Sequence, residues 1–381
     1  MLFRSLNVVV SKSHEISFQV SKWFSAAIIA LLFLYLLSCD ETIVYPPGYD
    51  CGDNDSIGVW KFLGLENETV TAIAVHPQKP NIIFAGTEKD FSAGIPGRLY
   101  RSIDCGKTWQ VLFEGVGHSQ SVSQVVFDPK NSNIVYAIPH PILKSTDGGN
   151  TWKDISNGIA LDWETRVSQI AIDPINPKII YAGTGGFFGG TLYKSTDNGT
   201  SWINLYRNED ETPGLRDGVI SLAIDPNNSN KIYAGTAWRC LILKSTNAGY
   251  TWIVSNDTDG LINSITIDHN SSQTIYTAIG QLLGFKRSLD GGNSWHSFNE
   301  GLGDSVSGVK IITNPVNTDL FSLAFSNSNT GVFVKKQSNE VWEKFNTSNI
   351  IISSYSDIYI TKDGRYLFLG SYSGMYKIKL E

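Results

Sequence analysis

The sequence predicts an all-β protein, a seven-bladed β-propeller of four-stranded antiparallel blades that an N-terminal strand closes by pairing with the C-terminal blade. Three observations predict this fold: an octapeptide that recurs five times, an apolar hairpin segment before each octapeptide, and tryptophans at near-regular spacing. The 381 residues are 41% hydrophobic, which suffices for a large core. With 30 Lys and Arg against 36 Asp and Glu, the chain lacks the basic field that a nucleic-acid partner requires.

The first 38 residues read as an export signal. Residues 23–37 form an apolar run after Lys22, which is shorter than the roughly 20 residues that span a bilayer. The run ends in the sequence LLSC, which resembles the lipobox of bacterial lipoproteins. The resemblance implies cleavage before Cys39 and a lipid anchor on its thiol. The alternative is a free cysteine beside an uncleaved anchor.

Three segments follow from this interpretation: a lipoprotein signal peptide over 1–38, the lipidated cysteine and a flexible tether over 39–56, and the propeller over 57–381. The tether is rich in Pro, Gly and Asp, a composition that disfavours packed structure. We therefore expect a protein of the bacterial cell envelope, lipid-anchored to a membrane and either periplasmic or surface-exposed.

The octapeptides have the form Ser-x-Asp-x-Gly-x-Thr/Ser-Trp, which resembles the Asp-box, or bacterial neuraminidase repeat. They are SIDCGKTW (102–109), STDGGNTW (145–152), STDNGTSW (195–202), STNAGYTW (245–252) and SLDGGNSW (288–295). Asp104, Asp147, Asp197, Asp290 and, in the fourth copy, Asn247 are expected to accept backbone N–H groups inside a hairpin turn. In the resembling families the box lies away from the ligand, so these residues are interpreted as structural.

A segment with two apolar alternating runs around a Pro- or Asn-rich turn precedes each octapeptide, which indicates a hairpin. These segments are 72–87, 124–139, 169–184, 221–236 and 264–280. Together with one strand before and one strand after the octapeptide turn, each unit has four strands.

Seven of the ten tryptophans fall on the last strand of a unit, 43 to 50 residues apart, which is the length of a propeller blade. They are Trp60, Trp109, Trp152, Trp202, Trp252, Trp295 and Trp342. The C-terminal segment supplies only three strands, and the segment 57–65 is a strand without a blade. We expect it to complete the seventh blade, because an open ring would expose two sheet edges.

The cysteines fit this closure. Cys51 precedes the closing strand and Cys105 lies in the first octapeptide, on the adjacent blade, so an exported protein can join them in a disulfide. Cys240 is left over and is expected to be buried and free.

Candidate ligand-binding residues lie in the loops between second and third strands and between blades, where propellers usually bind ligands. Trp163 and Trp238 are the tryptophans left after the signal and the repeat are subtracted, and their loops add charged and aromatic side chains suited to a sugar or a peptide. The set is Trp163, Glu164, Arg166, Phe187, Phe188, Arg207, Arg216, Asp217, Trp238 and Arg239. The alternative is that both tryptophans only plug the mouth of the ring. No cofactor is expected, and no metal, since the six histidines are scattered.

The repeats over 57–381 resemble four families: photosystem II stability/assembly-factor-like propellers, the sortilin-type ectodomain, sialidases and xyloglucan-active glycoside hydrolases. The first two resemblances imply protein-binding scaffolds and the last two imply enzymes. Sialidases have six blades and an arginine triad that this sequence does not match. Xyloglucanases resemble two fused propellers with the cleft between them, of which one ring is predicted here.

From these observations we expect a monomeric, membrane-anchored module that binds a protein or a glycan as a scaffold, without catalysing a reaction. The alternative is a glycoside hydrolase that uses carboxylates of the loops, Glu164 with Asp217 being one conceivable pair.

Overall fold

The computed structural model describes part of the chain. The described residues are 51, 54–90, 94–115, 121–161, 165–186, 189–206, 214–303, 305–325, 330–336, 338–345, 347, 350–352 and 356–380. The chain divides between Val44 and Tyr45 into two units, and all described residues belong to the second. The predicted signal peptide and Cys39 lie outside them. In the part that is described, no helix has the length and apolarity that crossing a membrane requires.

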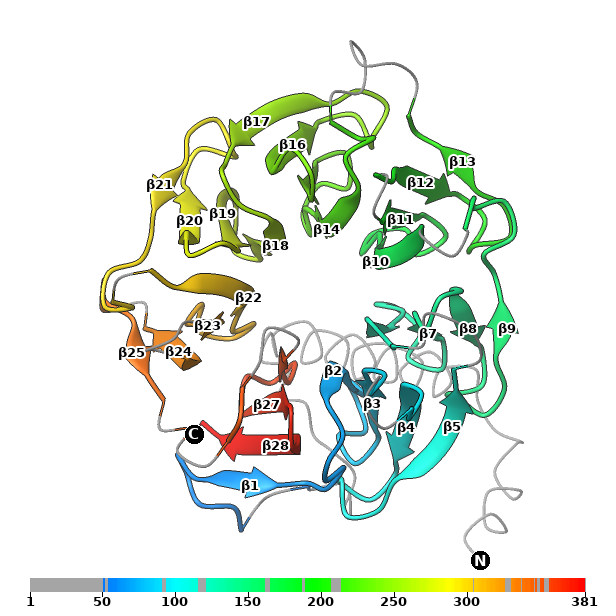
Figure 1. The fold of residues 1–381 in the computed structure, drawn as a ribbon, viewed down its shortest axis with the longest axis vertical. Helices are drawn as coiled ribbons and strands as arrows, with labels where there is room; N and C mark the ends of the chain where they lie inside the picture. The colour runs from blue at the N-terminus through cyan, green and yellow to red at the C-terminus, as the bar shows by residue number, and fades with distance from the viewer. Residues whose placement is uncertain are drawn as a thin grey trace, which may run out of the picture. The chain divides into compact units, whose positions relative to one another are not determined.

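Seven four-stranded antiparallel sheets make up the described residues, and Figure 1 shows them arranged as blades around a centre. The predicted seven-bladed propeller is confirmed. Each blade runs in chain order from its innermost to its outermost strand, except that β1 is the outermost strand of the seventh blade.

The strands of the first four blades are as follows. Blade 1 contains β2 (Val70–Val75), β3 (Ile83–Thr87), β4 (Arg98–Ser102) and β5 (Gln110–Glu114); blade 2 contains β6 (Val125–Phe127), β7 (Val135–Ala137), β8 (Leu143–Ser145) and β9 (Lys153–Asp154). Blade 3 contains β10 (Arg166–Ile172), β11 (Ile180–Gly185), β12 (Leu192–Ser195) and β13 (Ile203–Asn204); blade 4 contains β14 (Val219–Ile224), β15 (Ile232–Thr236), β16 (Leu241–Ser245) and β17 (Ile253–Asp257).

The other three blades complete the ring. Blade 5 contains β18 (Ile262–Asp268), β19 (Ser271–Ile279), β20 (Gly284–Ser288) and β21 (His296–Ser297); blade 6 contains β22 (Ser307–Thr313), β23 (Leu320–Phe325), β24 (Gly331–Lys335) and β25 (Glu343–Lys344). Blade 7 contains β26 (Asp357–Ile360), β27 (Tyr366–Ser371), β28 (Gly374–Lys379) and β1 (Trp60–Phe62). The second strands are the most deeply buried, so the core lies between neighbouring blades.

The two ends of the propeller meet in blade 7, as predicted from the segment 57–65, which had no blade of its own. β1 pairs antiparallel with β28, Trp60 standing opposite Ile378. A disulfide joins Cys51 to Cys105, with 5.3 Å between their Cα atoms, and so links the segment before β1 to blade 1. Asp55 adds an ion pair of 2.6 Å with the buried Lys377 of β28. The free Cys240 is half-buried, not fully buried as expected, because it lies in an exposed loop.

The octapeptide turns are held by their third residue. Asp147 Oδ1 accepts the backbone N–H groups of Asn150 and Thr151 at 3.0 and 2.9 Å, and its Oδ2 accepts the Thr151 hydroxyl at 2.7 Å. These bonds hold the pKa of Asp147 well below its ordinary value. Asp290 has the same pattern, and the corresponding bonds lower the pKa of Asp104 and of Asp197 to about 2.

The fourth turn keeps this geometry with an amide. Asn247 Oδ1 accepts the N–H of Thr251 at 2.9 Å, while its Nδ2 donates to the Thr251 hydroxyl at 2.8 Å. The hydroxyl that donates to aspartate in the other copies therefore accepts here. An asparagine satisfies this turn because only one of the two side-chain oxygens has to receive backbone N–H groups.

A cation just before the octapeptide serine ties each of several blades to the next. Arg101 donates to the Gly148 carbonyl at 3.1 Å, and the ammonium groups of Lys144 and Lys194 donate to equivalent carbonyls one blade further on, at 3.1 and 2.9 Å. These carbonyls lie in octapeptide turns. The repeat thus holds neighbouring blades together as well as shaping its own hairpin.

Candidate functional site

The loops between second and third strands all open at one end of the ring, because the strands of every blade alternate in direction. We call this end the loop face. The octapeptide turns, which join third to fourth strands, lie at the opposite end. The residues predicted to bind a ligand can therefore share one surface.

Three segments of blades 3 and 4 are joined by backbone hydrogen bonds on the loop face. The Gly190 N–H donates to the Arg216 carbonyl at 3.1 Å, and the Trp238 N–H donates to the Asp217 carbonyl at 3.1 Å. A Cβ on Gly190 would lie 2.0 Å from a backbone oxygen of the same loop, so only glycine allows this close approach. Gly190 thus lets this segment pack closely against the loop before β14.

These three joined segments form a platform on the loop face. Trp238 lies on this platform with 56% of its surface exposed. Its indole N–H donates to the Gly186 carbonyl at 3.1 Å, which orients the ring. Next to it, Arg239 Nε donates to Asp217 Oδ2 at 2.7 Å, an ion pair between blade 4 residues that flank β14 and β15. An exposed aromatic face beside a fixed charged pair is an arrangement that can stack a sugar ring and bind its hydroxyls.

The structure brings two further predicted residues to the same region. Arg216 is exposed, and its guanidinium lies 5.5 Å from the centre of the Tyr206 ring. Arg166, also exposed, begins β10 opposite Gly185, one residue from the carbonyl that holds the Trp238 indole. The other predicted residues, Trp163, Glu164, Phe187, Phe188 and Arg207, lie outside the described residues.

Glu88 is a candidate that the sequence analysis missed. It follows β3 directly and so stands on the loop face of blade 1, where its N–H donates to the Thr69 carbonyl at 2.9 Å. Burial raises the pKa of the Glu88 carboxyl. One feature of the sequence could have indicated Glu88. It is a charged residue directly after the apolar repeat segment, where blades 3 and 4 have Gly185 and Ala237.

A second carboxylate lies at the same end of blade 1. Glu68 precedes β2 by two residues; its Oε1 lies 2.9 Å from Arg98 Nη1 and accepts the Tyr100 hydroxyl at 2.6 Å. Arg98 also contacts Glu114 at 3.0 Å. The Thr69–Glu88 backbone bond brings the two segments together, so one half-buried carboxyl and one ion-paired carboxylate stand on adjacent chain segments.

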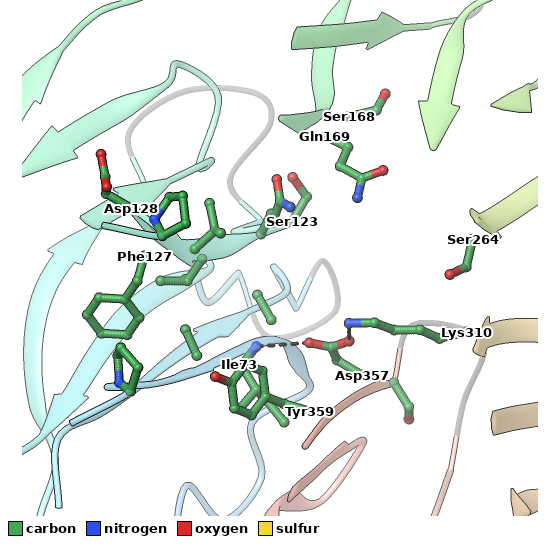
Figure 2. A pocket seen from close by; sticks show the side chains of 18 of the residues that line it. Ile73, Ser123, Phe127, Asp128, Ser168, Gln169, Ser264, Lys310, Asp357 and Tyr359 are labelled. Atoms are coloured by element: carbon green, nitrogen blue, oxygen red, sulfur yellow. Dashed lines mark hydrogen bonds and ion pairs between the residues drawn. The ribbon is translucent and has the colours of Figure 1, made fainter. Parts of the chain in front are cut away.

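A cavity of about 650 Å³ follows the centre of the ring (Figure 2). The innermost strands of all seven blades line it. Within the lining, Lys310 of β22 forms an ion pair with Asp357 of β26, and Asp357 Oδ2 also accepts the Ile73 N–H of β2 at 2.9 Å. Among the described residues, no group of three or more His, Cys, Asp or Glu side chains could hold a metal ion.

Side chains around this cavity connect every blade to the next. Thr71 bonds to Val122, Gln124 to Ile170, Gln169 to Leu222, Ser221 to Ile262, Asn263 to Gly308, Lys310 to Asp357, and Asp357 to Ile73. Most are bonds from a side chain to the backbone of the neighbouring innermost strand. The centre of the ring is therefore a closed series of polar links.

No protein-family model matches the chain. The chain is 28% identical over 162 residues to the xyloglucanase Xgh74A of Acetivibrio thermocellus, which covers 34% of this chain and 19% of the relative. The chain thus spans about a fifth of the length of that curated relative.

Solved structures share the fold. The GH74 xyloglucanase of Xanthomonas campestris matches with a TM-score of 0.65 and 14% identity, over 85% of this chain and 54% of that one. YCF48 bound to D1 peptide matches with a TM-score of 0.58 and 15% identity, over 85% of this chain and 95% of that one. The comparisons show a β-propeller, and a sequence similar to part of the xyloglucanases.

Proposed function

We propose that this propeller acts on a xyloglucan-type polysaccharide as a glycoside hydrolase, with the loop face as its substrate surface. The sequence similarity to a xyloglucanase carries the proposal, and it favours the hydrolase alternative of the sequence analysis over the scaffold interpretation. An exported, lipid-anchored position, as the N-terminal sequence predicts, would place the protein where such polysaccharides occur.

Trp238 supports binding of the polysaccharide. A pyranose ring presents an apolar face of C–H groups that packs on an indole, while its hydroxyls bond to charged groups at the edge. Trp238 offers that plane, and the Arg239–Asp217 pair stands next to it. Because backbone bonds to two neighbouring loops fix the platform, little conformational entropy is lost on binding.

Glu88 supports the chemistry. Cleavage of a glycosidic bond needs a carboxyl that is still protonated and can give its proton to the leaving oxygen, and a second, ionised carboxylate. Burial favours the neutral form of Glu88. Glu68, which forms an ion pair with the Arg98 guanidinium, is the second carboxylate, on the adjacent segment. In this proposal Glu88 is the general acid and Glu68 its partner.

The test compares the full-length protein with Glu88→Gln and Trp238→Ala, measuring reducing ends released from xyloglucan and the affinity for the polymer. Glu88→Gln should lower hydrolysis at least about 100-fold and leave affinity unchanged, because only proton transfer is lost. Trp238→Ala should weaken binding about 10-fold. Tyr250→Ala is the matched control, since Tyr250 is 52% exposed at the opposite end of β16.

The absence of both hydrolysis and binding by the unmodified protein would refute the proposal. Binding without hydrolysis would leave a glycan-binding module and remove Glu88 as an acid.

A protein-binding scaffold is the second candidate. One observation favours it: the chain covers 95% of the YCF48 structure bound to D1 peptide, but only 54% of the xyloglucanase structure. In that case the same loop face would bind a peptide, with Trp238 as the central anchor. Peptide binding that Trp238→Ala abolishes, in a protein inactive on xyloglucan, would support this candidate.

A further inference from the structure

The central channel has the dimensions of a ligand site that is separate from the loop face. Its volume of about 650 Å³ lies within the range of small-molecule pockets. The innermost strands of the seven blades form its wall, and the closed series of links between blades holds these strands in place. A rigid wall of this kind presents its polar groups at fixed positions.

The charges in the wall cancel. Among the described lining residues, the charged side chains are Lys310, Lys362, Asp128 and Asp357. Both oxygens of Asp357 are engaged, one by Lys310 and one by the Ile73 N–H. Asp128 Oδ1 receives the N–H groups of the turn that follows it, at 2.8 and 3.0 Å. The channel therefore has no net charge with which to select an ion.

Uncharged donors and acceptors remain available in the wall. The Ser168 and Ser264 hydroxyls, the amide nitrogen of Gln169 and the side-chain oxygen of Asn263 make no hydrogen bond to another described residue. None of these atoms is among the buried polar atoms without a partner, so solvent can reach them, and all four residues line the channel. In Figure 2, Gln169, Ser264 and Lys310 extend into one common space from three different blades.

We propose that the channel binds a neutral polyhydroxylated molecule of the size of a mono- or disaccharide. Sugar hydroxyls both donate and accept, which matches a wall that mixes hydroxyl, amide and ammonium groups without net charge. Tyr359 and Phe127 add apolar surface to the same wall. This site is independent of the polysaccharide site proposed on the loop face.

Titration calorimetry on the full-length protein with D-glucose, D-xylose and cellobiose tests the proposal. Saturable binding of at least one sugar is expected. Ser264→Phe, which fills the channel, should weaken it at least ten-fold, whereas Ser264→Thr keeps the hydroxyl and should retain it. Trp238→Ala should leave it unchanged, which separates this site from the loop face. Thermal melting checks that each variant folds, and Ser168→Leu replaces Ser264→Phe if that variant does not.

Three results would overturn the proposal. One is the absence of saturable binding of all three sugars, which would make the channel a water-filled axis only. Another is sugar binding that persists in a folded channel-filling variant. The third is inorganic phosphate that binds in competition with the sugar and is lost in the same variant, since the ligand would then be an anion. None of these results depends on whether xyloglucan is hydrolysed.

Discussion

A single side chain caps the turn after the innermost strand of a blade, and in blade 1 this side chain is of an unusual type. In blades 2 and 3, Asp128 and Asp173 accept two backbone N–H groups of the turn. In blade 1 the residue is His76, whose Nδ1 accepts the N–H groups of Gln78 and Lys79 at 3.1 and 3.0 Å. This requires a neutral imidazole. Burial, together with the charge of Lys79, lowers the pKa of His76 to about 4.

His76 should make stability depend on pH in a defined window. Because the folded-state pKa of about 4 lies below the ordinary 6.5, its contribution is complete above pH 6.5 and is lost as the pH falls toward 4. One proton limits the slope to about 1.4 kcal/mol per pH unit. Urea unfolding between pH 4 and 7 measures this slope. His76→Asn, which caps as Asn314 does in blade 6, should flatten it; an unchanged slope would assign it to other groups.

At the scale of elements, β1 is a short outermost strand that is far in the sequence from β28, the strand with which it pairs. It is three residues long and contributes exposed side chains to the rim of blade 7. Its position is reinforced on both sides: the Cys51–Cys105 disulfide lies before it, and the Trp109 indole donates to the Leu63 carbonyl after it at 2.7 Å. Closure of the ring therefore depends on blade 1 as well as on pairing with β28.

Removing the disulfide should destabilise the closure. The double variant Cys51→Ser/Cys105→Ser removes the cross-link between two residues 54 positions apart, so the unfolded chain gains conformational entropy. We expect a loss of about 2–4 kcal/mol in the free energy of unfolding, measured by denaturant titration. Cys240→Ser is the control, because that cysteine is free. Equal stability of the double variant and the control would contradict a structural role for the bond.

At the scale of the whole molecule, the seven blades are joined at two radii. The octapeptide cations connect several neighbouring blades toward the rim, and polar side chains connect all seven around the central channel. Asp357 has a special place in the inner series, because it connects blade 7 both to Lys310 of blade 6 and to Ile73 of blade 1. Blade 7 is also the blade assembled from the two ends of the propeller.

Asp357→Ala should therefore cost more than the loss of another inner link. It leaves the buried Ile73 N–H without its acceptor and unpairs Lys310, so we expect a loss of about 1–3 kcal/mol in unfolding free energy. Asp357→Asn keeps an acceptor for the Ile73 N–H and should recover part of the lost unfolding free energy. Denaturant titration compares both with Thr71→Ala, which removes one bond between blades 1 and 2. A smaller effect for Asp357→Ala than for Thr71→Ala would refute this ranking.

Much of the fold was predictable because repetition is visible in a sequence. The spacing of Trp109, Trp152 and their counterparts reports the blade length, and the unpaired segment at Trp60 indicates the closure. Of the candidate site, the grouping of Asp217, Trp238 and Arg239 was predicted from their loops. Glu88 was not, because its distinguishing property is partial burial with a raised pKa, which depends on how neighbouring segments pack.

Strand periodicity, turn residues and octapeptides are local features, so seven four-stranded blades could be predicted from the amino-acid sequence alone. Which polar groups meet depends on the folded chain: the Arg239–Asp217 pair beside Trp238, the neighbouring segments of Glu68 and Glu88, and the channel wall with its balanced charges. The first two groupings join residues that are distant in the sequence but belong to one blade, and the channel wall joins all seven blades, so these neighbours exist only after the chain has folded.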